Sequence, residues 1–224
     1  MAWREWVRGV EIQPSLYAAD FAHLGDQIEQ LLAAGTHVFH FDVGDAHFVP
    51  PVTIGPVVLR SIAPLIHARG GKLDCHLMVD DPAHHFPEIA SSGGDSVTFH
   101  VEVAQDVDKL LALAREHGLG AGVAFNPATP VEVAAEAANL GADLCLCMSI
   151  EPGYSGQEFM EDAYARIARL RELVDCLVQV DGGVKAENVR AVRDAGAELI
   201  VVGSGIFAAE DVGRAYDELV QAVT

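Results

Sequence analysis

Short apolar runs alternate with longer amphipathic segments along most of the 224-residue chain. The apolar runs have the length of buried strands and cover residues 11–15, 37–43, 72–78, 95–101, 120–126, 143–149, 176–182 and 198–204. The segments between them, such as 20–35 and 105–118, have helical periodicity, and several end in glycine, a common helix terminator. The pattern therefore predicts a repeating series of strand–helix units.

This alternation predicts parallel strands that are joined by helical crossovers. Eight units is the number that closes a (β/α)8 TIM barrel, and a doubly wound open sheet is the alternative. We see no linker, charge block or low-complexity segment that would divide the chain. Residues 1–224 are therefore expected to form a single (β/α)8 barrel domain, with its active site at the C-terminal ends of the strands.

Composition narrows the class of protein. Half of the residues are apolar, which is enough for a substantial core, and the formal charge is −19, from 14 basic and 33 acidic residues. Such a charge argues against nucleic acid as a partner, but not against a phosphorylated substrate, because backbone N–H groups and helix N-termini can bind phosphate. No apolar run approaches the roughly 20 residues that span a bilayer, and residues 1–15 lack a secretion-signal pattern. We expect no membrane association and a cytoplasmic location.

The four cysteines do not predict a metal or disulfide framework. Cys75, Cys145, Cys147 and Cys176 form no C-x-x-C pair, and each lies in an apolar stretch. Free cysteine often behaves as a small core residue. We therefore expect these residues to be buried rather than bound to structural zinc.

Ionisable residues gather where the barrel prediction places chemistry. His40 and Asp42 are two apart on one predicted strand, so they point to the same side, while His76 and Asp181 come late in two other strands. A lone strand histidine is more often structural, and an Asp before Gly is commonly a turn residue. Four such groups at inward strand ends, however, would be costly unless paired or bound to metal. Two imidazoles and two carboxylates suit Zn²⁺, Fe²⁺, Mn²⁺ or Co²⁺ better than Ca²⁺.

Glycine-rich segments follow the last three predicted strands. They lie at residues 152–156, 181–183 and 203–205. Each could be an ordinary turn between a strand and a helix. Because barrels frequently bind phosphate with the loops after strands seven and eight, three such segments at one end favour a phosphate site.

At these residues the sequence resembles the ribulose-phosphate 3-epimerase family. The matching motifs are PSLYAADF (14–21), HFDVGDAHFVP (40–50), HLMV (76–79), FNPATP (125–130), MSIEPGYSGQ (148–157) and VDGGV (180–184). The resemblance covers nearly the whole chain. It implies an enzyme that epimerises C3 of a ketose phosphate, D-ribulose 5-phosphate to D-xylulose 5-phosphate, by two-carboxylate proton transfer through an enediolate that a metal ion stabilises.

The resemblance also implies roles for individual residues. His40, Asp42, His76 and Asp181 match the ligands of one divalent metal ion, with Zn²⁺ expected first, and Asp42 and Asp181 match the acid/base pair. The matching substrate-binding positions are Ser15, His76, Gly153, Tyr154, Ser155, Gly156, Asp181, Gly182, Gly183, Gly203 and Ser204. Members of the family commonly assemble, so a homo-oligomer is expected.

The sequence departs from the family pattern at four positions. Gly44 stands where the family usually has Met, Ala46 and Ser155 where it has Gly, and Gln179 where it has Glu. Gly44 would enlarge or reshape the site, so a related 3-epimerase that acts on a hexulose phosphate such as D-allulose 6-phosphate is the alternative.

Three other functions fit the sequence less well. A Schiff-base aldolase needs a lysine at a strand end, but Lys72, Lys109 and Lys185 are placed elsewhere. The D-x-K-x-x-D pattern of one decarboxylase family is absent. A non-catalytic phosphate-binding barrel would not need both Asp42 and Asp181.

Overall fold

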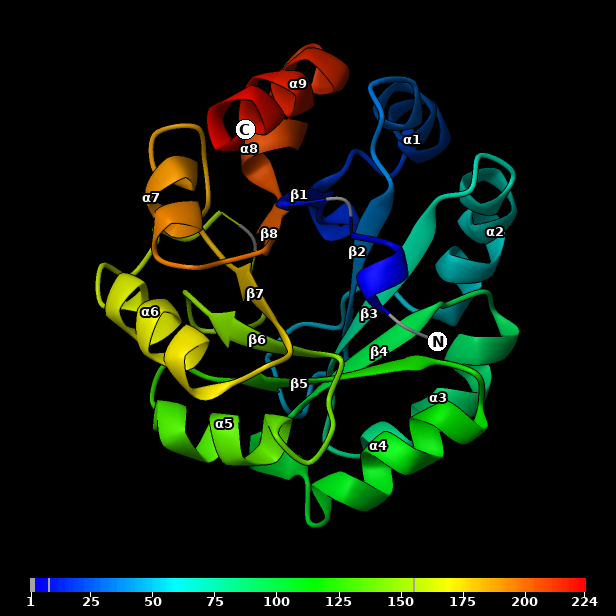
Figure 1. Ribbon diagram of the computed structural model, residues 1–224. Coiled ribbons are helices and arrows are strands. Elements are labelled where there is room, and N and C mark those ends of the chain that lie inside the picture. Colours follow the sequence, from blue (N-terminus) through cyan, green and yellow to red (C-terminus); the bar gives the residue numbers. More distant parts are fainter. Residues whose placement is uncertain (1–2, 8, 155) are drawn as a thin grey trace.

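The computed structural model describes residues 3–7, 9–154 and 156–224, and its helices surround a ring of parallel strands (Figure 1). The strands are β1 (Glu11–Pro14), β2 (Val38–Gly44), β3 (Lys72–Met78), β4 (Ser96–His100), β5 (Gly120–Phe125), β6 (Leu144–Met148), β7 (Leu177–Asp181) and β8 (Leu199–Val202). The helices are α1 (Leu24–Ala33), α2 (Pro56–His67), α3 (Pro82–Ser91), α4 (Val107–Glu116), α5 (Val131–Ala138), α6 (Ala163–Leu173), α7 (Val189–Asp194), α8 (Ser204–Phe207) and α9 (Val212–Val223). Short 3₁₀ turns occupy η1 (Trp3–Glu5), η2 (Leu16–Ala18) and η3 (Val101–Val103).

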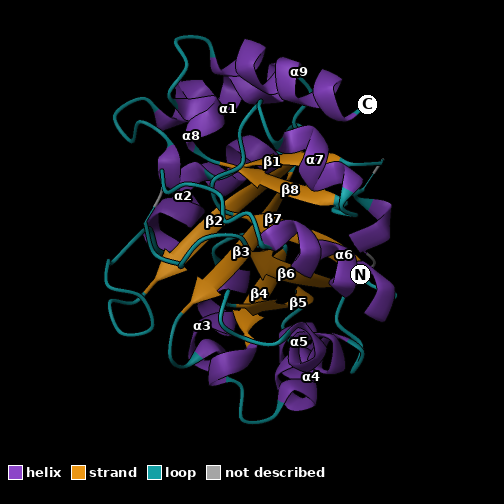
Figure 2. Ribbon diagram, turned by 90° about the vertical axis from the view of Figure 1, so that its left-hand side faces the viewer, coloured by secondary structure: helices purple, strands orange, loops and turns teal. Residues whose placement is uncertain are grey.

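The eight strands form a nearly closed barrel. Hydrogen-bonded neighbours run in the order β1-β8-β7-β6-β5-β4-β3-β2, and every ladder is parallel. A parallel bridge between Ser15 and His40 joins the end of β1 to β2 and completes the ring. The side view in Figure 2 shows the strands tilted within the layer of helices. This arrangement confirms the predicted (β/α)8 barrel and excludes the open doubly wound sheet.

Side chains alternate along each strand between two cores. Those that point outward pack against the helices in one large apolar cluster, which includes Phe39, Phe41 and Val180. The inward side chains form a second cluster inside the barrel. There Trp3 and Trp6, with ring centroids 4.8 Å apart, pack with the inward residues of the strands.

Most predicted boundaries differ from the structure by at least one residue, and two of the differences have a clear physical cause. The segment predicted as helix from residue 20 begins at Leu24, because the Asp20 side chain accepts a hydrogen bond from the Ala22 N–H and holds a turn. The predicted strand 198–204 ends at Val202, because Gly203 turns the chain and its carbonyl accepts the first hydrogen bonds of α8.

Two compositional expectations can be compared with the structure. Cys75, Cys145 and Cys147 are buried free thiols, as expected, whereas Cys176 is a free thiol that is only partly buried. Within the described ranges, no helix is long and apolar enough to cross a membrane.

The Trp3 side chain is expected to contribute strongly to stability because it is 1% exposed within the barrel cluster. Replacing Trp3 by Ala should lower the free energy of unfolding by about 3–5 kcal/mol. Denaturant unfolding followed by circular dichroism measures this change. Val57→Ala, at a side chain that is 75% exposed, is the control and should change stability by less than about 0.5 kcal/mol. Equal effects of the two substitutions would contradict the assignment of Trp3 to the core.

Candidate metal centre and phosphate pocket

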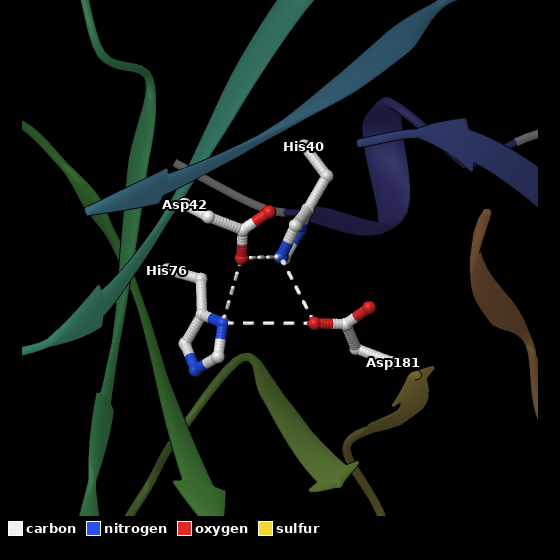
Figure 3. Close-up of side chains that lie close together, drawn as sticks. All are labelled: His40, Asp42, His76 and Asp181. Carbon is white, nitrogen blue, oxygen red and sulfur yellow. Dashed lines mark hydrogen bonds and ion pairs between the residues drawn. The ribbon is translucent and has the colours of Figure 1, made fainter. Parts of the chain in front are cut away.

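Four ionisable side chains from three strands meet inside the mouth of the barrel. His40 and Asp42 come from β2, His76 from β3 and Asp181 from the last position of β7. One nitrogen or oxygen atom of each lies within 4.8 Å of the others. His40 lies in the middle of its strand, deeper than the sequence indicated, but its side chain faces the same space as Asp42 (Figure 3).

The four groups form a quadrilateral in which the two carboxylates occupy opposite corners (Figure 3). Asp42 Oδ1 lies 3.3 Å from His40 Nε2 and 3.1 Å from His76 Nδ1. Asp181 Oδ2 lies 3.9 Å from His40 Nε2 and 3.8 Å from His76 Nδ1. Each carboxylate therefore faces both imidazoles across one small space.

This group could bind a divalent metal ion. His40 Nε2 is buried and has no hydrogen-bond partner within the described part of the chain, although it points at the two carboxylates. A buried nitrogen without a partner is costly, and coordination of a cation would satisfy it. Two imidazole nitrogens and two carboxylate oxygens are suitable donors for zinc and its neighbours among the transition metals.

The two carboxyl groups have opposite electrostatic environments. Burial raises the pKa of Asp42, but the neighbouring imidazoles of His40 and His76 outweigh it and hold that pKa far below its ordinary value. Burial, followed by the negative charge of Asp42, raises the pKa of Asp181 to about 7. Asp42 is thus held as an anion, whereas the environment of Asp181 favours its neutral form until a cation balances the charge.

A polar layer beneath the four groups fixes His40. The Asp74 carboxylate lies 3.1 Å from His40 Nδ1 and accepts hydrogen bonds from Gln179 Nε2 at 2.7 Å and Ser96 Oγ at 2.8 Å. Gln179 Nε2 also donates to Gln13 Oε1 at 2.6 Å. Because Asp74 accepts from His40 Nδ1, the ring presents Nε2 to the site.

Sequence reasoning did not single out Asp74 or Gln13, and it noted Gln179 only as a departure from the family. The alternation of side chains along a strand could have identified them, because each lies two residues before a predicted site residue, namely Ser15, His76 or Asp181.

The glycine-rich loops and the strand ends line an open pocket, and the empty space within it, open solvent included, is about 520 Å³. Its wall consists of Ser15, Tyr17, Asp42, Met78, Met148, Ile150, Gly153, Tyr154, Gly156, Asp181, Gly182, Gly183, Val184, Val201, Gly203 and Ser204. Most of the predicted substrate-binding residues are therefore in one wall. Ser155 lies outside the described residues, and His76 is fully buried and lies outside the wall. Ser15 donates a hydrogen bond of 2.6 Å to Asp42 Oδ2 and so connects the pocket with the ionisable cluster.

Close packing explains why glycine follows Asp181. Gly182 and Gly183 have φ values of 118° and 64°, which glycine adopts readily. A Cβ atom at Gly183 would come within 2.5 Å of the Phe159 backbone nitrogen, and one at Gly182 within 2.3 Å of Ile150 Cγ1. The loops that follow β6 and β7 therefore pack closely against each other at the pocket wall.

Gly44 does not enlarge the pocket as the sequence had suggested. It lies outside the pocket wall, and a Cβ atom there would meet Val49 Cγ2 at 2.9 Å and Thr53 Cγ2 at 3.0 Å. The loop after β2 thus occupies the space beside Gly44. Within that loop Ala46 has φ 62°, a conformation that is uncommon for a residue with a side chain.

Comparisons with known proteins agree with this geometry. The ribulose-phosphate 3 epimerase family matches residues 11–207. Ribulose-phosphate 3-epimerase of Escherichia coli K12 is 39% identical over 213 residues, which cover 93% of each chain. Its counterpart in Bacillus subtilis strain 168 is 35% identical over 216 residues, or 94% of this chain and 98% of the relative.

Solved structures support the fold. The 3-hexulose-6-phosphate synthase of Salmonella typhimurium superposes with a TM-score of 0.73 at 17% identity, over 95% of this chain and 98% of its own. A second structure titled 3-hexulose-6-phosphate synthase gives 0.72 at 19% identity, over 96% and 100%. At such low identity these similarities show the barrel alone.

Metal binding should stabilise the protein through these four residues. Zn²⁺ at 100 times its dissociation constant should raise the free energy of unfolding by about 2.7 kcal/mol, because it binds the folded state. Thermal unfolding of chelator-treated protein, with and without Zn²⁺, measures the effect. His76→Ala should remove it, whereas His117→Ala, at an exposed histidine of another segment, should retain it. Full stabilisation of His76→Ala by Zn²⁺ would show that the ion binds elsewhere.

Proposed function

The chain belongs to the ribulose-phosphate 3-epimerase family, and we propose that it catalyses epimerisation at C3 of a ketose phosphate, with D-ribulose 5-phosphate and D-xylulose 5-phosphate as the pair of substrates. The observation that carries the proposal is the placement of Asp42 and Asp181. They occupy opposite corners of one buried cluster, and both line the pocket. Inversion of a carbon centre requires a proton to leave one face and another to arrive at the opposite face.

Asp42 and Asp181 are proposed as the two proton carriers. From ribulose 5-phosphate, the Asp42 carboxylate accepts the C3 proton, and the Asp181 carboxyl group donates a proton to the other face of the same carbon. The roles reverse in the opposite direction. Ser15 keeps one Asp42 oxygen in place with its 2.6 Å hydrogen bond and leaves the other oxygen facing the cluster.

His40 and His76, together with the two aspartates, are the proposed ligands of one divalent ion, with Zn²⁺ expected first and Fe²⁺, Mn²⁺ or Co²⁺ as alternatives. When bound, such an ion supplies positive charge that stabilises the negative charge developing on the substrate as its proton leaves. Asp74 and the bonds to it orient His40 for this role.

The glycine loops are proposed to bind the phosphate group. Gly182, Gly183, Gly203 and Ser204 lie in the pocket wall with Asp181, so a phosphate there would be adjacent to the reacting carbon's position. Backbone N–H groups can bind an anion without a lysine, which is consistent with the net charge of −19. Gly153, Tyr154 and Gly156 complete the wall on the side of β6.

Three broader features stay predictions. We propose that residues 1–224 fold as one domain and that the enzyme forms a homo-oligomer in the cytoplasm. Light scattering after size-exclusion chromatography would measure the assembly.

The pentulose phosphate is preferred over a hexulose phosphate because the names of the relatives indicate ribulose phosphate and because the space beside Gly44 is filled.

Asp42→Asn and Asp181→Asn should each lower kcat by about 10²–10⁴-fold, because an amide cannot carry the proton. Exchange of the C3 hydrogen with deuterated solvent should be lost in parallel. Both are measured at saturating metal, with metal content determined on the same samples, so that loss of the ion is separated from loss of proton transfer.

Asp194→Asn is the matched control, since this aspartate is exposed on α7 and pairs with Arg193. It should retain wild-type turnover. Normal exchange and turnover in both Asp42→Asn and Asp181→Asn would show that the two-carboxylate scheme is wrong.

Gly183→Ala should raise KM for the sugar phosphate much more than it changes kcat, because the added Cβ displaces the loop against Phe159. Gly118→Ala is the matched control. Gly118 also has a positive φ, 77°, but a Cβ there would meet nothing within 4 Å. Steady-state kinetics of both variants separate backbone strain from loss of the pocket wall. Equal KM values for Gly183→Ala and wild type would contradict the phosphate assignment.

A further inference from the structure

A second series of hydrogen-bonded polar groups extends from His76 through the buried His100 to Glu102, whose side chain is 24% exposed. His76 Nε2 lies 2.8 Å from His100 Nε2, and the two rings stack with centroids 5.0 Å apart. His100 Nδ1 lies 3.2 Å from Glu102 Oε2. His100 is the last residue of β4 and is fully buried, and the Phe48 ring lies beside it at a centroid distance of 4.6 Å.

The far end of this chain is an anchored carboxylate. Glu102 Oε1 accepts hydrogen bonds from the Asn126 N–H at 2.7 Å and from the Thr129 hydroxyl. Both donors belong to the segment that follows β5. The other oxygen, Oε2, is thereby left for His100. The two oxygens of Glu102 therefore have different partners: Oε1 anchors the side chain and Oε2 faces His100.

The direction of every hydrogen bond in the chain follows from the charge of Glu102. A carboxylate only accepts, so His100 must carry its proton on Nδ1 and present a bare Nε2. His76 must then donate from Nε2, which leaves its Nδ1 without a proton. Nδ1 is the atom that faces Asp42 and Asp181. The carboxylate of Glu102 thus determines, through His100, that His76 has the tautomer that can bind a metal ion through Nδ1.

We propose that Glu102 and His100 are positioning residues that hold His76 in its metal-binding tautomer and orientation. This inference rests on the proposed function, because it assumes that the cluster binds a divalent ion. It adds two residues that are neither among the residues of the pocket wall nor among the four candidate ligands. Partners of this kind typically contribute 10–100-fold to metal affinity.

Glu102→Gln reverses the polarity of the chain with little change in shape. An amide has one acceptor oxygen, and the Asn126 N–H and the Thr129 hydroxyl both donate to the same side, so they should hold that oxygen. The amide NH₂ then faces His100 Nδ1 and favours the opposite tautomers of both histidines. Affinity for Co²⁺, measured by competition with a chromogenic chelator, should fall about 10–100-fold. Glu132→Gln removes the same charge from an exposed glutamate and should leave affinity unchanged.

A pair of substitutions at His100 separates hydrogen bonding from packing. His100→Leu removes the acceptor for His76 and should weaken Co²⁺ binding as strongly as Glu102→Gln. His100→Gln can accept from His76 and donate to Glu102, so it should restore most of the affinity. Nitrogen-15 NMR of the zinc-loaded protein should show the Nδ1–H tautomer of His100 in wild type and its loss in Glu102→Gln.

Unchanged Co²⁺ affinity and an unchanged His100 tautomer in Glu102→Gln would overturn the proposal. Equal losses in His100→Gln and His100→Leu would also overturn it, because packing would then explain the effect. If the wild-type protein turns over substrate and binds Co²⁺, and Glu102→Gln binds Co²⁺ with the same affinity, only this inference is wrong. Wild-type protein that binds no divalent ion would sink the metal site as well.

Discussion

The parallel register between β2 and β3 is the constraint on which the site depends. It pairs His40 with Asp74 and Asp42 with His76, so each histidine has a carboxylate on the neighbouring strand. A slip by one residue would turn the inward side chains of β2 toward the helices, where an apolar core leaves no room for ionised groups. The large apolar cluster outside the barrel stabilises this register, and the register in turn places the ionisable groups together inside the barrel.

Charge burial shapes the rest of the mouth. Asp42 is 4% exposed and His40 and His76 are fully buried, an arrangement that is costly unless every polar atom finds a partner. Asp74 is the partner of His40 Nδ1, and His100, which is itself paired with Glu102, is the partner of His76 Nε2. What remains are the atoms that point at a common space between two carboxylates. A cation in that space, and a substrate above it, would satisfy those atoms and make use of their charge.

Much of this could be predicted from the sequence, because strand periodicity is a local property. The eight strands and the barrel follow from the alternation of apolar runs with helical segments. The meeting of His40, Asp42, His76 and Asp181 follows from their inward-facing positions on three strands. The loops could not be predicted in the same way. Gly44 suggested a larger site, but the space beside it depends on how the loop through Val49 folds back.

The residues that support the site, Asp74, His100 and Glu102, could be predicted only in part. Asp74 and His100 obey the same inward rule as the site residues, yet a buried polar residue is informative only when its partners are known. Glu102 is held in place by hydrogen bonds from Asn126 and Thr129, which belong to a different loop. Hydrogen-bond direction along such a chain is a property of the assembled barrel, and spacing in the sequence does not carry it.

The central claim is that two carboxylates on opposite sides of one carbon exchange protons with it. The most direct measurement is the deuterium content of D-xylulose 5-phosphate formed by the wild-type enzyme from D-ribulose 5-phosphate in D₂O, during the first turnovers. The account predicts deuterium at C3 of the product, because the carboxyl group that donates the proton has equilibrated with solvent. Product that retains its original hydrogen at C3 would contradict it, as would complete failure to form product in the presence of metal.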